Sequence, residues 1–251
     1  MKGFITKKQF SLITILIVVG LSVFITAFVT SFRFSPSLTL DEMYQAAVLD
    51  ALIFQSDDIY PLVSLIQGDP LTTWNDTGQV LLVTWNDTPE LYPRDATVTT
   101  EDYEVWTFTD KEIAQWYRLN NKGVKNWDLR FKQLLGLPPN TSYSHFTAFW
   151  VSTENILRPA YNQDVTFPEM PSHFESTVDE TFLHWFNNNK LFSYFEELYP
   201  WTRLGYTYDW GSSYTNYGLT EFIVLPNTSV NVKFTLSTNE FLKFLESQII
   251  D

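Results

Sequence analysis

Apolar and polar residues follow one another along most of this 251-residue chain with the periods of short helices and strands. Residues 41 to 54 are apolar over most of a helical surface, which predicts a buried helix. Further helices are predicted at residues 109–117, 127–135, 177–198 in two pieces, and from 237 to the last residues given. Strands are predicted at residues 79–85, 103–108, 146–151, 205–210, 219–225 and 230–236. Because helices and strands mix without regular β-α-β alternation, we expect an α+β domain with a mostly antiparallel sheet flanked by helices.

Three of the predicted helices begin with the sequence of a capping box, a Ser or Thr followed three residues later by Glu. These tetrapeptides occupy residues 109–112, 177–180 and 237–240. In such a box, side chains bond backbone amides that have no partner inside the helix. The run from Asn187 to Asn189 predicts an interruption of the helix that begins near residue 177, because asparagine competes with helical backbone bonds.

One apolar run is longer than any of these elements. Leu12 to Val29 include no charged residue, and eighteen residues in a helix span about 27 Å, close to the roughly 30 Å of a hydrocarbon core. Lys2, Lys7 and Lys8 precede the run, which places the N-terminus in the cytoplasm by the positive-inside rule. We therefore expect a single-pass protein of the cell membrane with four parts: a cytoplasmic segment 1–9, a transmembrane signal-anchor helix 10–32, a tether 33–40 and an extracytoplasmic domain 41–251. The alternative is a cleaved signal peptide, whose apolar region is usually shorter, about 7 to 15 residues.

The charge balance changes after this run. Residues 41 to 251 contain 29 acidic and 12 basic residues, a net charge of −17. Such a surface repels phosphate backbones and anionic headgroups, so we expect no nucleic-acid partner. The chain has no cysteine, which excludes thiol chemistry and thiolate zinc sites. It also has no glycine-rich phosphate loop and no G-x-S-x-G turn, and we expect neither a cofactor nor a bound metal ion.

Two histidines are weak candidates for chemistry. His145 lies at the start of a predicted strand near Ser142 and Ser144, where a serine nucleophile would have a base close by. His184 follows Glu180 by four residues on one predicted helix, a spacing that lets two side chains bind one ion. A hydrogen-bonded histidine and a helix ion pair explain these positions without chemistry, and we favour those interpretations.

The densest aromatic stretch is YPWTRLGYTYDWG, residues 199 to 211. As a strand from Arg203 it alternates between one aromatic and aliphatic face and one polar face, which predicts a half-buried strand. The apolar face consists of Leu204, Tyr206, Tyr208 and Trp210. Arg203 and Asp209 share the polar face six residues apart, about 20 Å at roughly 3.3 Å per residue, so they cannot contact each other. Each needs a partner on another element, or a ligand.

Glu221 interrupts the apolar face of the next predicted strand, residues 219–225. A buried carboxylate must be paired, or its pKa must shift. The candidate partners are Arg130, Arg158 and Arg203. We favour an ion pair that stabilises the sheet, and the alternative is a ligand-binding or catalytic role for Glu221.

Several segments of the C-terminal half resemble a family of hypothetical bacterial proteins. They are LRFKQLLGLPP (129–139), FWV with ILRP (149–159), PWTRLGYTYDW (200–210) and GLTEF (218–222). The third is the most specific of them. The resemblance implies a bacterial source, and it implies no activity, substrate or catalytic residue.

No arrangement of residues in the sequence predicts a particular reaction. We therefore expect a binding or interaction domain at the cell envelope, with an envelope protein or a glycan as partner and with its oligomeric state open. The alternative is an envelope hydrolase that acts on glycan or peptide through carboxylates and a histidine. Candidates for either role are Glu221, Arg203, Asp209, His145 and His184.

Overall fold

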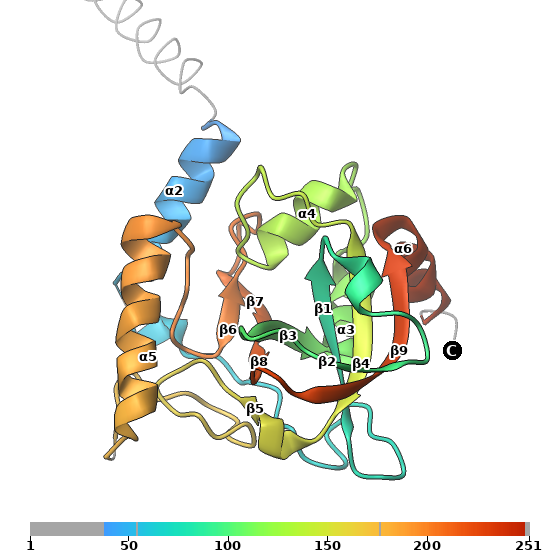
Figure 1. Ribbon diagram of the computed structural model, residues 1–251. Helices are drawn as coiled ribbons and strands as arrows, with labels where there is room; N and C mark the ends of the chain where they lie inside the picture. Colours follow the sequence, from blue (N-terminus) through green and yellow to red (C-terminus); the bar gives the residue numbers. More distant parts are fainter. Residues whose placement is uncertain (1–37, 54, 176, 249–251) are drawn as a thin grey trace, which may run out of the picture. The chain divides into compact units, whose positions relative to one another are not determined.

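The computed structural model describes residues 38–53, 55–175 and 177–248 (Figure 1). The chain divides into two compact units, residues 1–39 and 40–251. The second unit contains every helix and strand described below.

A seven-stranded sheet forms the centre of this domain. Its strand order is β2-β9-β4-β1-β3-β8-β5, and every neighbouring pair is antiparallel. Its strands are β1 (Val80–Asn86), β2 (Thr97–Thr99), β3 (Val105–Thr109), β4 (His145–Val151), β5 (Ile156–Leu157), β8 (Phe222–Val224) and β9 (Ser229–Ser237). A separate two-stranded antiparallel sheet pairs β6 (Tyr206–Tyr208) with β7 (Tyr217–Thr220). The predicted α+β class with a mostly antiparallel sheet is confirmed.

Both faces of the large sheet are covered, which explains why β1 is apolar at consecutive positions. Leu81, Val83 and Trp85 point to one face, where they pack against the helices α3 (Asp110–Asn120), α4 (Trp127–Leu134) and α6 (Thr238–Ser247). Val80 and Leu82 point to the other face, where loop side chains cover them. The alternation of side chains along a strand divides the core into these two clusters.

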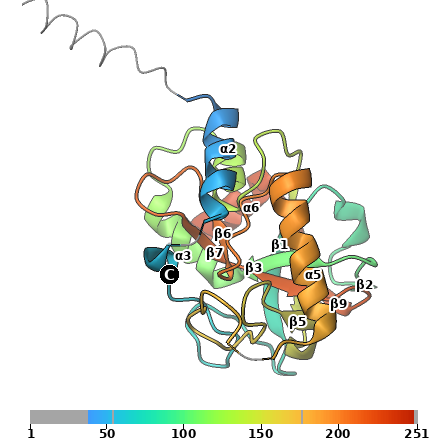
Figure 2. The same cartoon turned by 90° about the vertical axis from the view of Figure 1, so that its left-hand side faces the viewer.

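The two further helices are α2 (Leu40–Ala51) and α5 (Glu180–Leu191). They lie together on another side of the domain, which faces the viewer in Figure 2. Helix α5 continues directly into a π-helical turn, Phe192–Glu196. Buried residues of α2 pack against Tyr194 of this turn and against Trp210. The aromatic stretch after α5 is thereby enclosed between α2 and the rest of the domain.

The predicted fold class needs one correction. Among the residues that the structure describes, no helix is long and apolar enough to cross a membrane. The fold class of the described chain is therefore the α+β domain alone. The expected span 10–32 and the expected cytoplasmic segment 1–9 lie outside the described residues, as does most of the tether 33–40. The location at a cell membrane rests on those residues and stays a prediction.

Three local predictions also change. The helix does not end at Asn187 but continues through the asparagines to Leu191, where the π-helical turn follows. The strand expected at 205–210 is reduced to β6. Arg203 and Gly205 adopt positive φ angles of 62° and 82° just before it, and a turn begins at Trp210 after it. The strand expected at 219–225 divides at Glu221, whose two neighbours belong to different sheets.

The three capping boxes have different outcomes. Ser237 and Glu240 form the complete box at the start of α6. Helix α5 begins later than expected, and Asp179 caps it by accepting from the amides of Thr181 and Phe182. At α3 the side chain of Thr109 makes no capping hydrogen bond.

Candidate binding cavity

A cavity of about 370 Å³ lies between the large sheet and the segment that follows α5. Its walls come from β1 and β3, from the chain after α4, from the end of α5 with its π-helical turn, and from the aromatic stretch that contains β6. The lining residues are Thr84, Trp85, Asn86, Asp87, Thr88, Tyr92, Tyr103, Glu104, Val105, Trp106, Thr107, Phe108, Leu135, Gly136, Leu137, Tyr143, Asn189, Phe192, Ser193, Tyr199, Pro200, Trp201, Tyr206, Thr207, Tyr208 and Glu221. This volume falls within the usual range of small-molecule sites, roughly 300–1,000 Å³.

Aromatic rings line the cavity from its base to its mouth. Tyr206 is almost completely buried, whereas Trp106 and Tyr103 are 38% and 54% exposed. The stretch from Tyr199 to Tyr208 contributes four of the rings. The high aromatic content therefore has two uses in this fold, to fill the core and to line a cavity. Such rings can stack against a flat ligand or against the apolar face of a sugar.

Glu221 reaches the cavity because of where the chain changes sheets. Thr220 pairs with Tyr206 in the small sheet, and Phe222 pairs with Thr107 in the large one. Between them, the backbone amide of Glu221 donates to the carbonyl oxygen of Gly205 at 3.0 Å. The crossover thus places one carboxyl group among aromatic rings from both sheets.

The carboxyl group of Glu221 lacks the partner that the sequence led us to expect. The side chain is buried, and its Oε1 atom has no hydrogen-bond partner. Burial raises the pKa of Glu221 from 4.5 to about 8, and the Arg158 charge and the nearby Trp201 indole offset this only in part. The group is therefore mainly protonated at pH 7. Of the three candidate arginines, Arg158 is the one whose charge acts on this pKa.

Asn189 also lines this cavity. Its Nδ2 atom is buried and has no hydrogen-bond partner. It lies in the last turn of α5, just before Phe192 and Ser193 of the π-helical turn, which also line the cavity. A π-helical turn re-aims side chains relative to a regular helix, and such turns occur often at functional sites.

Arg158 is already engaged by the protein. Its side chain is fully buried, and its Nη2 atom donates to the carbonyl oxygens of Val63, Val165 and Phe167 at 3.0, 3.0 and 3.2 Å. Burial lowers the pKa of Arg158 to about 10, and the charge of Glu112 has the largest opposing effect. Arg158 thus remains charged at pH 7 and fastens loops to the sheet.

Glu112 is held by a separate set of donors. The Tyr217 hydroxyl donates to its Oε1 atom at 2.6 Å, and the amide and hydroxyl of Thr220 donate to it as well. Burial raises the pKa of Glu112, and these hydrogen bonds and the Arg158 charge oppose the rise. This carboxyl group is satisfied within the protein, in contrast to that of Glu221.

The other two candidates from the aromatic stretch do not line the cavity. Asp209 forms an ion pair with Arg130, and Arg203 donates from Nη2 to the carbonyl oxygens of Ala51 and Leu52 at 2.8 and 3.2 Å. Both side chains are buried, so the face predicted to be solvent-exposed is covered as well. Their contacts give each a role in holding elements together.

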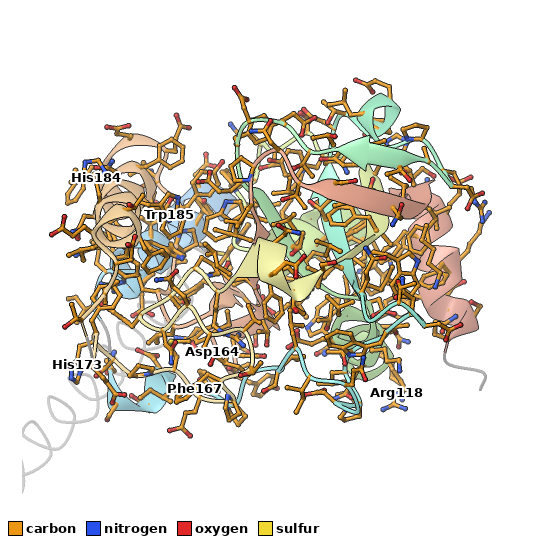
Figure 3. All side chains as sticks on the ribbon, turned by 60° about the horizontal axis from the view of Figure 1, so that its bottom comes forward. Arg118, Asp164, Phe167, His173, His184 and Trp185 are labelled. Carbon is orange, nitrogen blue, oxygen red and sulfur yellow. The ribbon has the colours of Figure 1, made fainter. Side chains whose placement is uncertain are left out.

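The histidines also lie outside the cavity lining. His145 contacts the neighbouring Ser144, with 2.8 Å between Nδ1 and Oγ, at the first position of β4. His184 projects from the outer side of α5, where its Nδ1 contacts the Asn188 side chain at 3.1 Å (Figure 3). Within the described residues, no three His, Cys, Asp or Glu side chains come close enough together to hold a metal ion.

No protein-family model, curated protein or solved structure matches this chain. The resemblance to hypothetical bacterial proteins therefore stays a prediction, and the function is argued from the cavity itself.

Of the five candidate residues from the sequence, Glu221 is the one that lines the cavity. The sequence feature that marked Glu221 was its position as a charged residue on an otherwise apolar strand face. Asn189, Phe192 and Trp106 were missed as site residues. The asparagine run did mark an unusual position, but its interpretation as a helix break was wrong: the helix continues there, and Asn189 lines the cavity.

Proposed function

We propose that this domain binds a small ligand with a flat ring in the cavity, and that this binding is its function. The observation that supports the proposal most strongly is the aromatic lining of this 370 Å³ cavity, which Glu221 and Asn189 also line.

The expected affinity follows from the apolar area that a ring would bury. A ring that buries about 100–150 Å² of apolar surface gains roughly 3 kcal/mol at about 25 cal/mol per Å². Stacking against a protein ring adds about 0.5–1.5 kcal/mol. This gain of about 4 kcal/mol is an upper limit, because association also costs translational and rotational freedom, so a single-ring probe without matched polar groups should bind with a Kd of about 1 mM or weaker.

The test uses indole as the probe and two phenylalanines of the π-helical turn as a matched pair. Phe192 lines the cavity and is 43% exposed, whereas Phe195 does not line it and is 71% exposed. Saturation-transfer NMR with the whole chain should detect indole binding. Phe192→Ala should weaken it severalfold, and Phe195→Ala should leave it unchanged. The proposal fails if indole does not bind, or if both substitutions have the same effect.

An envelope hydrolase remains the second candidate, on one observation. A carboxyl group that stays protonated near neutral pH suits a general acid, and Asp87 and Glu104 line the same cavity as Glu221. Hydrolysis of a glycan that is lost in Glu221→Gln while glycan binding persists would support this candidate. The predicted envelope partner, a protein or a glycan, stays a prediction.

A further inference from the structure

We propose that the ligand of this cavity is a cation, a flat ring that carries an ammonium group on a short chain. This inference rests on the proposed function and specifies the charge of the ligand. It begins from the charged groups of the lining. Among the described residues that line the cavity, Asp87, Glu104 and Glu221 are acidic, and none is Lys, Arg or His. Residues 41 to 251 also have a net charge of −17, which attracts cations from a distance.

Two of these carboxyl groups stand at the open end of a fork between β1 and β3. The last pair of the two antiparallel strands in this direction is Val83 with Phe108, and beyond it residues of both strands line the cavity. Asp87 follows Val83 by four residues, and Glu104 precedes Phe108 by four. Each therefore lies at most about 13 Å from the fork, at roughly 3.3 Å per residue. Neither forms an ion pair with any residue that the structure describes.

Aromatic rings accompany the two carboxylates at this end of the cavity. Tyr103 and Trp106 flank Glu104 in the sequence, line the cavity and are partly open to water. Burial raises the pKa of Tyr103 and of Tyr143, and the charge of Asp87 adds to both rises, so this charge acts on rings from two segments. The faces of Trp and Tyr rings attract cations within about 6 Å. The mouth thus offers an ammonium group both rings and carboxylates.

The inner part of the cavity suits the ring of the ligand instead of its charge. Tyr206 and Trp201 are buried there, and burial keeps the Glu221 carboxyl mainly protonated at pH 7. An ammonium group taken that far would lose its water without gaining a full opposite charge. At the mouth, the ammonium group keeps part of its hydration. An anion would meet Asp87 and Glu104 there, with no basic side chain in the described lining to offset them.

Three probes with the same indole ring separate these possibilities. Tryptamine has an ammonium group on a two-carbon chain, tryptophol has a neutral hydroxyl on the same chain, and indole-3-acetate has a carboxylate. An alkylammonium group, like that of lysine, is protonated at pH 7. We expect tryptamine to bind the whole chain about ten-fold more tightly than tryptophol at low ionic strength, because an exposed ion pair and a cation–π contact each contribute about three-fold. Indole-3-acetate should bind more weakly than tryptophol.

Ionic strength gives a second measurement on the unaltered chain. At about 1 M salt the Debye length falls to about 3 Å, which screens charges at an open mouth. The preference for tryptamine over tryptophol should therefore decrease, while the affinity for tryptophol should not fall. Ligand-observed NMR titration measures each affinity. A preference that does not change with salt would contradict pairing with Asp87 and Glu104.

A repeated tetrapeptide supplies the matched control for the variants. WNDT occurs at residues 74–77 and again at 85–88, and its aspartate is exposed in both copies. Asp87 lines the cavity and Asp76 does not. Asp87→Asn should weaken tryptamine binding about three-fold and leave tryptophol binding unchanged, whereas Asp76→Asn should change neither. Both substitutions alter the net charge equally, so a difference between them reports the position of the charge. Glu104→Gln should act as Asp87→Asn does.

The outcomes distinguish this inference from the proposed function. The inference is overturned if tryptamine binds no more tightly than tryptophol, or if Asp87→Asn and Asp76→Asn have the same effect. It is also overturned if Asp87→Asn weakens tryptophol and tryptamine equally, since the aspartate would then act through the shape of the cavity. In each of these cases the proposed function stands as long as indole binds. If neither indole nor any of the three probes binds, the proposed function fails with the inference.

Discussion

Arg130 and Asp209 form a largely buried, two-pronged ion pair, with 2.9 Å between Nη1 and Oδ1 and 2.6 Å between Nη2 and Oδ2. Asp209 is 2% exposed, and the Arg130 guanidinium also lies over the Trp116 ring at 4.7 Å. The pair fastens α4 to the chain just after β6. Because the residues after α4 and those of β6 both line the cavity, this ion pair holds two of its walls together.

Neutralising one partner of this pair should destabilise the domain strongly. Asp209→Asn leaves the Arg130 charge without its partner, and breaking a buried pair in this way costs about 3–5 kcal/mol. Urea denaturation measures the loss. The control is Asp95→Asn in the exposed Arg94–Asp95 pair, which should change stability by less than about 1 kcal/mol. Equal losses in the two variants would show that Arg130–Asp209 contributes no more than a surface pair.

Glu221 should make stability depend on pH. Its pKa is about 8 in the folded state and near 4.5 in the unfolded chain, so the folded state retains a proton that the unfolded state loses between these values. The contribution of this proton to the stability of the folded state is present in full below pH 4.5 and is lost as the pH rises to about 8. The Glu221→Gln side chain cannot ionise. The free energy of unfolding of this variant should therefore rise, relative to that of the original chain, by on the order of 3–5 kcal/mol between pH 4.5 and pH 8.5. Denaturation at several pH values measures the difference, and a difference independent of pH contradicts the prediction.

Tyr217 should be important because it satisfies Glu112. Tyr217→Phe removes the hydroxyl that donates to Glu112 at 2.6 Å, and leaving a buried polar group with one hydrogen bond fewer costs about 1–3 kcal/mol. Thermal and urea denaturation should both show the loss. Tyr214→Phe is the matched control, because Tyr214 is 97% exposed. A Tyr217→Phe variant as stable as Tyr214→Phe would mean that other donors compensate for the missing hydroxyl.

Two of the predicted capping boxes should respond differently to the same kind of substitution. Ser237→Ala removes an N-cap that accepts from the Glu240 amide, and should cost about 1 kcal/mol. Thr177→Ala should have no measurable effect, because Asp179 caps α5 instead. Urea denaturation of both variants provides the comparison. A cost for Thr177→Ala similar to that for Ser237→Ala would contradict the observed start of α5.

The sequence predicted most of the local structure because local patterns carry that information. The strands at β1, β3, β4 and β9 and the helices α3, α4 and α6 appear close to their expected positions, since each has a clear apolar period. The short strands β2 and β5, three and two residues long, were missed because so few residues show no period. They exist because β9 and β8 offer them hydrogen-bonding partners.

Of the residues that line the candidate site, the sequence marked Glu221 alone. A carboxylate on an apolar strand face signals an unusual environment, but that pattern cannot distinguish an ion pair from a cavity. The decision depends on what lies opposite the side chain. Arg158, which the sequence offered as a partner, bonds to three loop carbonyl oxygens, and neither those loops nor their distance from Glu221 can be read from residue spacing.

The sequence by itself therefore determined the α+β class of the domain, most of its elements, its acidity and the unusual position of Glu221. These follow from side-chain period and composition, which act over a few residues. Only the tertiary structure decided that the aromatic stretch 199–211 serves both the core and a cavity, and that Glu221 and Asn189 meet that cavity from different elements. The division of the 219–225 strand and the turn of α5 toward the cavity depend on packing between distant segments, and no local pattern encodes those contacts.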